Sequence, residues 1–333
     1  MKANILEKVN MKTTLAWIIS ILSVINLSFA VQHSLADDWA LEENHLEKFE
    51  ISDSVILHFD GKTWNNVFHG NDMWLNDIYG FDSNDVFAVG EQGVILHYNG
   101  NSWTRQNSPT KQRLHKIWGS SGKDVYACGD FGAMLHYDGT EWKIYQATPA
   151  RWCRGIWGID ESHIFITGNA GKIFHYNGSE WTEQMTGATD TLFDVNGTGP
   201  KSVYTVGEYG SVFSYDGKHW KKHKRFTDKT LSSVWMADAK SVYITGSNGI
   251  IYHYDGLKWS RQTSGTSSFL RRIRGVDAQN IFAVGDHATI LHYNGRIWKT
   301  QKTGDIYSFL GVWGNRKDNV FVVGANSAGI SDH

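Results

Sequence analysis

Seven tryptophans recur through the chain at a constant spacing of 39 residues, with no insertion or deletion between them. They are Trp64, Trp103, Trp142, Trp181, Trp220, Trp259 and Trp298. A fixed period of this length is the mark of a repeat architecture, in which each unit is one supersecondary element. Any fold proposed for this chain must therefore place near-identical units side by side.

Each unit contains four short apolar segments and a tight turn. In one copy the segments are residues 114–118, 125–128, 134–137 and 141–145. Asp-Gly or Asn-Gly precedes every repeated tryptophan, as at Asp138-Gly139, and this pair between apolar runs is a strong hairpin signal. No stretch keeps helical apolar spacing over three turns. Four strands in about 40 residues predict an all-β, seven-bladed β-propeller of four-stranded antiparallel blades.

The ends of the repeat predict how the ring closes. Residues 55–66 hold only the third and fourth strands of a unit, and residues 309–324 hold only the first and second. Together they complete one blade, and this two-plus-two-strand clasp hides edges that would otherwise pair with other chains. Deletion of residues 54–66 is expected to cause aggregation.

The units resemble the propeller repeats of many secreted bacterial proteins. The resemblance rests on Ile117-Trp118-Gly119, Asp124-Val125-Tyr126-Ala127 and Met134-Leu135-His136-Tyr137-Asp138-Gly139. It covers residues 54–324 and extends distantly to Ycf48-like photosystem II assembly factors, tectonin-type lectin repeats and the Asp-box turn of sialidases. It implies a WD40/YVTN-like propeller fold.

Residues that recur in every blade are interpreted as structural, because seven equivalent places cannot form one asymmetric site. A histidine occupies one position in six blades, with Ser214 in the seventh, and we expect each to bond within its own blade; the six are His58, His97, His136, His175, His253 and His292. The repeated tryptophans are expected to pack between blades. The basic run Lys221, Lys222, Lys224 and Arg225 is read as protection of an outer edge strand.

The first 36 residues are interpreted as a signal peptide. Lysines precede the apolar run 15–25, and small-residue sites follow at Ser28-Phe29-Ala30 and Ser34-Leu35-Ala36. Residues 37–53 then form an N-terminal extension, 54–324 the propeller and 325–333 a C-terminal tail. We expect an exported protein, periplasmic or extracellular, that is monomeric and is not an integral membrane protein after signal cleavage. An uncleaved anchor is the alternative, although the run is short for one.

The two cysteines, Cys128 and Cys153, take the places of the apolar Val89 and Leu114 of another unit. Buried free thiols are therefore the favoured interpretation, and a disulfide in an oxidising compartment is the alternative. Two cysteines are too few for a structural metal site. No metal and no cofactor is expected.

Function is expected where the blades differ at matched positions on one face. The loops that lead into the innermost strands carry Trp74, Arg113, Trp152 and Phe269, and two residues later come His115, Arg154 and Arg271. Aromatic and arginine side chains dominate binding hot spots. The predicted ligand-binding residues are Trp74, Arg113, His115, Trp152, Arg154 and Arg271.

We expect a binding or scaffold propeller rather than an enzyme. Trp74 and Trp152 would stack on a sugar or a peptide, and the arginines would pair with acidic groups; the partner is a glycan or an envelope protein. A formal net charge of −2 argues against nucleic acid. A glycoside hydrolase or lyase using carboxylates among Glu91, Asp130, Glu208 and Asp286 is one alternative. A purely structural assembly factor is the other.

Overall fold

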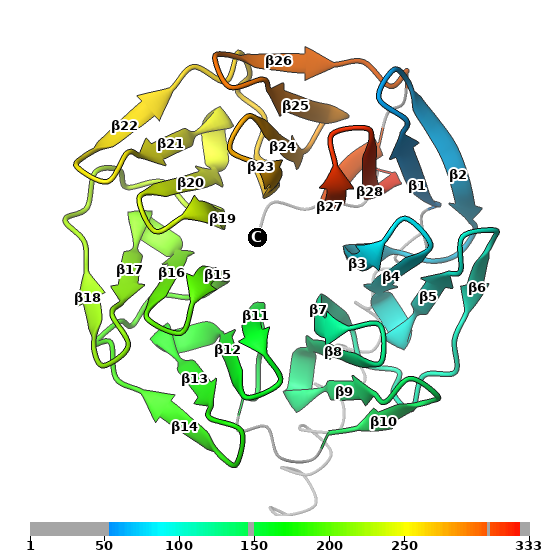
Figure 1. Ribbon diagram of the computed structural model, residues 1–333, viewed down its shortest axis with the longest axis horizontal. Helices are drawn as coiled ribbons and strands as arrows, with labels where there is room; N and C mark the ends of the chain where they lie inside the picture. The colour runs from blue at the N-terminus through cyan, green and yellow to red at the C-terminus, as the bar shows by residue number, and fades with distance from the viewer. Residues whose placement is uncertain (1–52, 146–149, 305–306, 327–333) are drawn as a thin grey trace, which may run out of the picture. The chain divides into compact units, whose positions relative to one another are not determined.

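The computed structural model describes residues 53–145, 150–304 and 307–326, and these form a β-propeller. Seven four-stranded antiparallel sheets surround one axis (Figure 1). The seven-bladed all-β prediction is confirmed. The predicted signal peptide and nearly all of the N-terminal extension lie outside the described residues, as does most of the C-terminal tail. Ala325 and Asn326, at the start of that tail, still belong to a strand.

Each blade runs from an innermost to an outermost strand. Blade 1 contains β3 (Leu75–Asp82), β4 (Asp85–Gly90), β5 (Ile95–Tyr98) and β6 (Trp103–Arg105). Blade 2 contains β7 (Leu114–Ser121), β8 (Asp124–Gly129), β9 (Met134–Tyr137) and β10 (Trp142–Ile144). Blade 3 contains β11 (Gly155–Asp160), β12 (His163–Thr167), β13 (Ile173–Tyr176) and β14 (Trp181–Gln184).

The next three blades follow the same order. Blade 4 contains β15 (Leu192–Gly199), β16 (Ser202–Gly207), β17 (Val212–Tyr215) and β18 (Trp220–Lys222). Blade 5 contains β19 (Leu231–Asp238), β20 (Ser241–Gly246), β21 (Ile251–Tyr254) and β22 (Trp259–Gln262). Blade 6 contains β23 (Leu270–Asp277), β24 (Asn280–Gly285), β25 (Thr289–Tyr293) and β26 (Trp298–Gln301).

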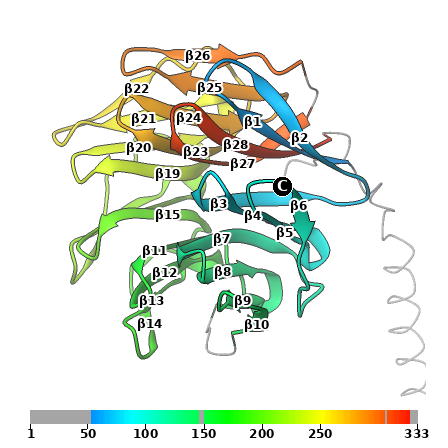
Figure 2. The same ribbon diagram turned by 45° about the vertical axis from the view of Figure 1, so that its right-hand side comes forward.

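Blade 7 is the predicted clasp. It combines β27 (Tyr307–Arg316) and β28 (Asn319–Asn326) with β1 (Ser54–Phe59) and β2 (Trp64–Gly70). The strand order is β2-β1-β28-β27, and β1 pairs with β28 antiparallel (Figure 2). The closure prediction is therefore confirmed: the first described strands and the last share one sheet.

Adjacent blades interlock through an indole and a glycine. The Trp118 ring lies against Gly158 of the next blade, where an added Cβ would sit 2.6 Å from ring atom Cη2. Trp157 and Gly197 repeat the arrangement, again at 2.6 Å. A glycine is needed at these positions because a side chain would occupy the space of the indole.

The repeated histidines are structural, as predicted, although not all of them form hydrogen bonds. All six stack on an aromatic ring of the second strand of their own blade, with centroids 4.0–4.5 Å apart. His58, His97, His136 and His253 also hydrogen-bond within their own blades. In His175 and His292 the Nε2 atom has no partner in the described part of the chain. Stacking is therefore the shared role.

The repeated tryptophans lie between blades, as predicted. Trp142 of blade 2 meets Phe87 of blade 1 edge-on at 6.0 Å, and Trp220 of blade 4 meets Phe165 of blade 3 at 6.1 Å. Within the described ranges, no helix is long and apolar enough to span a membrane.

Candidate functional site

One face of the ring gathers the predicted site loops. The loop that leads into each innermost strand, here called the lead-in loop, lies beside the turn between the second and third strands, here called the 2–3 turn. The N–H of Glu91 donates to the carbonyl of Trp74 at 2.8 Å, and the N–H of Asp130 donates to that of Arg113 at 3.1 Å. Blades 4, 5 and 6 repeat this bond at 3.0 Å. We call this end of the propeller the loop face.

Several of the predicted site residues sit at β-bulges. In blade 2 the register shifts between Leu114 and Lys116, which leaves His115 without a partner in the ladder. The same register shift in blade 6, between Leu270 and Arg272, leaves Arg271 without a partner in the ladder. A bulge bends its strand and redirects the extra side chain. These residues consequently reach toward the loops instead of following the alternation of the sheet.

The 2–3 turns hold residues in the left-handed region, and two of these are exposed aromatics. Phe131 has φ +54° and Tyr209 has φ +51°, with 62% and 58% of each residue exposed. Positive φ is uncommon for residues other than glycine, and it is unfavourable for a bulky side chain. Neither aromatic was singled out from the sequence, although each follows a residue that was. The left-handed conformation belongs to the repeat, since Gln92, Ala170, Asn248 and His287 adopt it at the matched position. What distinguishes Phe131 and Tyr209 is an exposed aromatic side chain there.

Phe131 forms a cluster with two predicted residues. Its ring lies 4.8 Å from that of Trp152, between centroids, and the guanidinium of Arg154 lies 6.0 Å from the Trp152 ring. Phe131 belongs to blade 2, whereas Trp152 and Arg154 lead into blade 3. We call Phe131, Trp152, Arg154, His115 and Asp130 the junction cluster.

His115 lies between a cation and an anion. Its Nε2 atom is 2.6 Å from Asp130 Oδ1 and 2.9 Å from Arg154 Nη1. In any one protonation state this nitrogen serves only one of them, donating to Asp130 or accepting from Arg154. The shorter contact favours donation to Asp130. Arg154 then keeps a 3.3 Å bond from Nε to Asn169 and an ion pair at 3.9 Å between Nη1 and Asp130 Oδ1. Among the described contacts its Nη2 group has no partner, and this group is available to an acidic ligand.

Burial and charge set the protonation of this pair. Burial lowers the pKa of His115, and Arg154 lowers it further, against an opposing effect of Asp130. Burial by itself would raise the pKa of Asp130, but the hydrogen bond from His115 and the nearby cations lower it overall. At neutral pH Asp130 is therefore ionised and His115 neutral.

Two of the remaining predicted residues, Arg113 and Arg271, are already paired with carboxylates on the loop face. Arg113 forms an ion pair with Glu91. Arg271 lies over the Phe269 ring at 4.6 Å and donates two bonds to Asp286, at 2.8 and 2.9 Å. Among the described contacts, none joins Trp74 or Arg271 to the junction cluster. The structure thus brings together His115, Trp152 and Arg154 of the six predicted residues.

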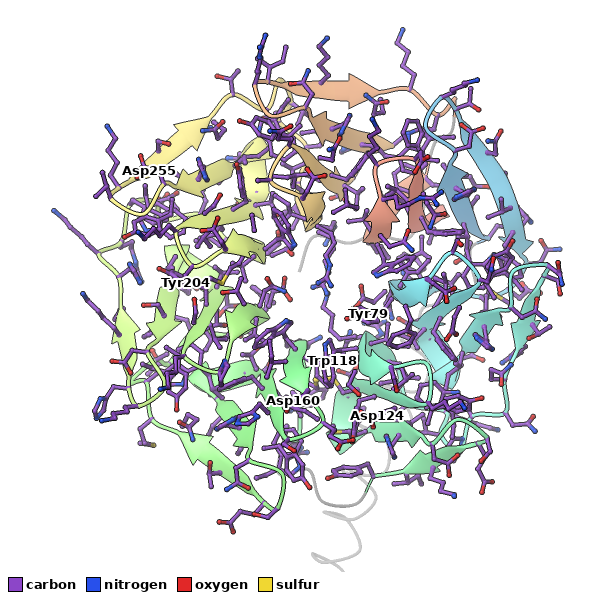
Figure 3. All side chains as sticks on the ribbon, viewed as in Figure 1. Tyr79, Trp118, Asp124, Asp160, Tyr204 and Asp255 are labelled. Carbon is purple, nitrogen blue, oxygen red and sulfur yellow. A yellow bond between two sulfur atoms is a disulfide. The ribbon has the colours of Figure 1, made fainter. Side chains whose placement is uncertain are left out.

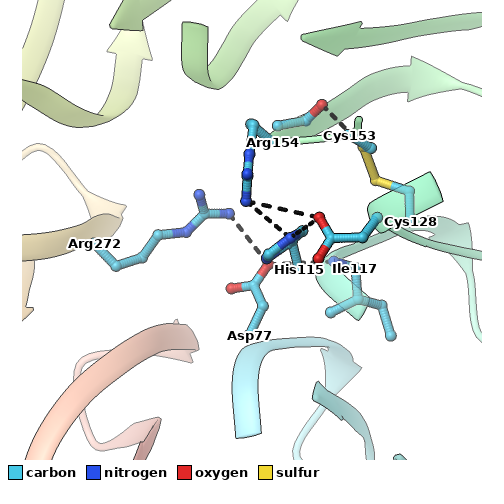
Figure 4. The surroundings of a disulfide bond; sticks show 9 residues. Asp77, His115, Ile117, Cys128, Cys153, Arg154 and Arg272 are labelled. Carbon is cyan, nitrogen blue, oxygen red and sulfur yellow. Dashed lines mark hydrogen bonds and ion pairs between the residues drawn. A yellow bond between two sulfur atoms is a disulfide. The ribbon is translucent and has the colours of Figure 1, made fainter. Parts of the chain in front are cut away.

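The cysteines are not free thiols, so the favoured interpretation was wrong. Cys128 and Cys153 form a disulfide with their Cα atoms 5.7 Å apart (Figure 4). The matched residues Val89 and Leu114 pack in one core cluster between blades 1 and 2. The two matched positions meet across a blade junction, which brings the cysteines within bonding distance despite their separation of 25 residues.

An ionic cluster that the sequence analysis missed occupies the central axis. Arg272 of blade 6 reaches Asp194 of blade 4 at 2.7 Å. It also reaches Asp77 of blade 1 at 3.4 Å (Figure 4). Burial and the charge of Arg272 lower the pKa of Lys116, which occupies the matched position in blade 2. Side chains project into the centre of the ring (Figure 3), and a void lined by Arg272 and Asp194 measures about 10 Å³.

The carboxylates of the enzymatic alternative each have a partner. Glu91 pairs with Arg113, Asp130 with His115 and Asp286 with Arg271. Glu208 accepts the N–H of Thr191 at 2.8 Å. In the part of the chain that the structure describes, no group of three His, Cys, Asp or Glu residues is placed to hold a metal ion. These carboxylates are therefore placed to organise the loops.

A hollow borders the junction cluster. It measures about 270 Å³ and is lined by Trp152, Asn169, Lys172, Phe174, Glu183 and neighbouring loop residues. Lys172 and Glu183 form an ion pair on its wall. The hollow presents an indole beside an amide and a carboxylate.

Comparison with known proteins identifies the fold. No family model and no curated protein matches the sequence. Among solved structures, YCF48 bound to D1 peptide is similar with a TM-score of 0.63 at 16% identity, over 76% of this chain and 89% of that one. YCF48 from Cyanidioschyzon merolae has a TM-score of 0.62 at 14% identity, over 79% of this chain and 97% of that one. The WD40 propeller domain of Doa1 has a TM-score of 0.68 at 12% identity, over 81% of this chain and 97% of that one. The chain is therefore a seven-bladed β-propeller with the fold shared by the YCF48 and WD40 propellers.

Proposed function

We propose that this propeller is a recognition module that holds a short segment of a partner protein on its loop face, at the junction of blades 2 and 3. The observation that carries the proposal is Phe131, an exposed aromatic in a left-handed turn, packed against Trp152. An exposed aromatic side chain of this size is apolar surface that a bound partner would cover.

The chemistry of the junction cluster favours a segment with an apolar side chain next to a carboxylate. Phe131 and Trp152 offer aromatic contact area, and the Nη2 group of Arg154 is available beside it, while Nη1 lies 3.9 Å from Asp130. An arginine fork matches a carboxylate in two-point geometry. Arg271 has the same chemistry, but Asp286 occupies its fork. One similar fold, the YCF48 structure, is described as bound to D1 peptide, which supports a peptide rather than a small metabolite.

The test is selection of ligands from a displayed library of random short peptides, followed by titration of the selected peptide. Phe131→Ala is expected to weaken binding by about tenfold or more, as for an anchor residue. Tyr209→Ala is the matched control, since it removes an equally exposed aromatic from the same turn two blades away. Equal losses in both variants, or no selectable peptide, would defeat the proposal.

A glycan is the second candidate ligand, and the hollow beside Trp152 is the observation that favours it. Its indole, amide and carboxylate are groups that stack on and hydrogen-bond to a sugar ring. A glycan-array screen of residues 37–333 would decide between a glycan and a peptide ligand. It is run beside a Trp74→Ala/Trp152→Ala/Arg154→Ala variant of equal thermal stability. Binding by the parent that the variant loses would move the assignment to a lectin-like propeller.

We also propose that the protein works outside the cytosol. The apolar run 15–25 with its small-residue sites supports export, and a disulfide suits an oxidising compartment. Fractionation of cells expressing the full chain tests this, because retention in the cytosol with both cysteines reduced would contradict it.

A further inference from the structure

The disulfide is attached to both loops of the junction cluster. Cys128 lies two residues before Asp130 and three before Phe131, and these two residues belong to the 2–3 turn of blade 2. Cys153 lies between Trp152 and Arg154, in the lead-in loop of blade 3. It is the one disulfide of a chain with two cysteines, and it joins the two segments that supply the aromatic contact.

In five of the other blades the lead-in loop is bonded to its own blade. The N–H of the first 2–3 turn residue donates to the lead-in carbonyl in blades 1, 2, 4, 5 and 6, at 2.8–3.1 Å. The innermost strand then begins with a leucine paired to the glycine that ends the second strand, as in Leu114↔Gly129 and Leu192↔Gly207. Both ties fix the lead-in residue directly before the strand.

Blade 3 lacks both ties. β11 begins two residues later than its counterparts, and its ladder starts at Gly155↔Thr167. Within the described residues, the N–H of Asn169 forms no bond to the carbonyl of Trp152. The loop bonds to its own blade through the N–H of Arg154, which donates to Thr167 at 2.8 Å.

What holds the residues before Arg154 is blade 2. The N–H of Gly132 donates to the carbonyl of Arg151 at 2.7 Å, and the N–H of Cys153 donates to that of Gly129 at 3.0 Å. Matched backbone bonds occur at other junctions, as from Leu192 to Gly168 at 3.0 Å. The disulfide from Cys153 to Cys128 is the tie that this junction adds. Trp152 is therefore placed against Phe131 by the neighbouring blade. Both cysteines are buried, so the bond lies beneath the cluster and does not contact a ligand itself.

We infer that Cys128 and Cys153 are positioning residues of the proposed site, and that their disulfide fixes Trp152 against Phe131 in the geometry that recognition requires. The inference rests on the proposed function. It assigns the disulfide a local task in one junction of the ring, in addition to any general stabilisation.

The chain supplies its own control variant. Cys128→Val/Cys153→Leu installs the pair found at the matched junction, Val89 and Leu114, which packs in the core there. Cys128→Ala/Cys153→Ala serves if the larger side chains prevent folding. Both variants are measured as full chains, well below their unfolding midpoints, against the peptide selected from the library.

The peptide-binding experiment separates positioning from stability. In the parent, Trp152→Ala is expected to weaken binding by about tenfold. If the disulfide acts through Trp152, the valine–leucine variant binds about tenfold more weakly, and adding Trp152→Ala to it costs less than about twofold more, because coupled sites are non-additive. Parental affinity in the folded variant, or an undiminished Trp152→Ala effect, would overturn the inference.

A second readout needs no ligand. Hydrogen exchange of residues 151–154 should accelerate by about tenfold or more in the variant, while the matched residues 190–193 of blade 4 remain unchanged. Unchanged exchange at 151–154 would overturn the positioning role even if a peptide binds. Faster exchange there, with no peptide bound by the parent, would leave the positioning role standing and would instead contradict the proposed function.

Discussion

Breaking the ionic bridge across the central axis should strongly lower the free energy of unfolding. Arg272→Leu removes the guanidinium and leaves Asp77 and Asp194 buried, at 1% and 2% exposed. Removing one partner of a buried ion pair costs about 3–5 kcal/mol, because the other charge remains without compensation. Here two carboxylates lose the same partner.

The backbone limits this cost. Asp194 keeps the N–H of Val234 at 3.0 Å and the hydroxyl of Ser233 at 2.6 Å, and Asp77 keeps the N–H of Ile117 at 3.2 Å. We therefore expect the lower part of the range, about 3–4 kcal/mol. For a domain of about 270 residues that corresponds to a fall in Tm of about 5–7 °C.

Urea unfolding of matched variants measures the effect. Arg316→Leu is the control, since this arginine is in an exposed pair with Asp318, for which we expect a loss of no more than about 1 kcal/mol. Arg272→Leu/Asp77→Asn/Asp194→Asn/Lys116→Met removes all four charges of the axial cluster and should recover most of the loss. The reasoning is refuted if Arg272→Leu costs no more than Arg316→Leu, or if the quadruple variant is no more stable than the single one.

Three further predictions concern packing, pH and closure. Gly158→Ala would place a Cβ 2.6 Å from Trp118 and should lower the free energy of unfolding in urea by about 1–3 kcal/mol. Gly199→Ala is the control and should be nearly neutral, because no atom lies within 4 Å of its added Cβ. Equal costs would contradict the interlocking of indole and glycine between blades. Burial lowers the folded-state pKa of five histidines, which are His115, His175, His223, His253 and His292. Below about pH 6.5 the unfolded chain therefore binds more protons than the folded chain, and stability should fall as the pH drops. A Tm that is level from about pH 8 to 5 would contradict this. Deletion of residues 54–66 removes β1 and exposes the edge of β28, so the product should aggregate; a monomer by light scattering would count against the clasp.

Features that repeat could be predicted from the sequence, because each blade gave an independent view of the same position. The clasp followed from which strands the terminal segments lacked, and the histidines were recognised as structural from their recurrence. Blade 4 shows how closely the pattern is kept. Where Ser214 replaces the histidine, His223, directly after β18, bonds to its hydroxyl at 2.9 Å and lies near Tyr204.

Features that depend on register or on contact between blades could not be read from spacing. The bulge at His115 shifts the alternation of β7 by one residue, and such a shift reverses which side chains face the axis. Lys116, Asp77 and Arg272 were therefore overlooked as an axial set. The disulfide was misjudged for a related reason, since the sequence does not show that the Val89 and Leu114 positions touch.

The claim that the junction of blades 2 and 3 is the binding site is tested most directly by locating the bound peptide. Hydrogen exchange of the parent protein, with and without the library-selected peptide, gives that location. The account predicts protection concentrated at residues 130–132 and 151–155, around Phe131 and Trp152. Protection confined to the turns at the opposite end, such as 82–85 and 121–124, with none at these two segments, would contradict it.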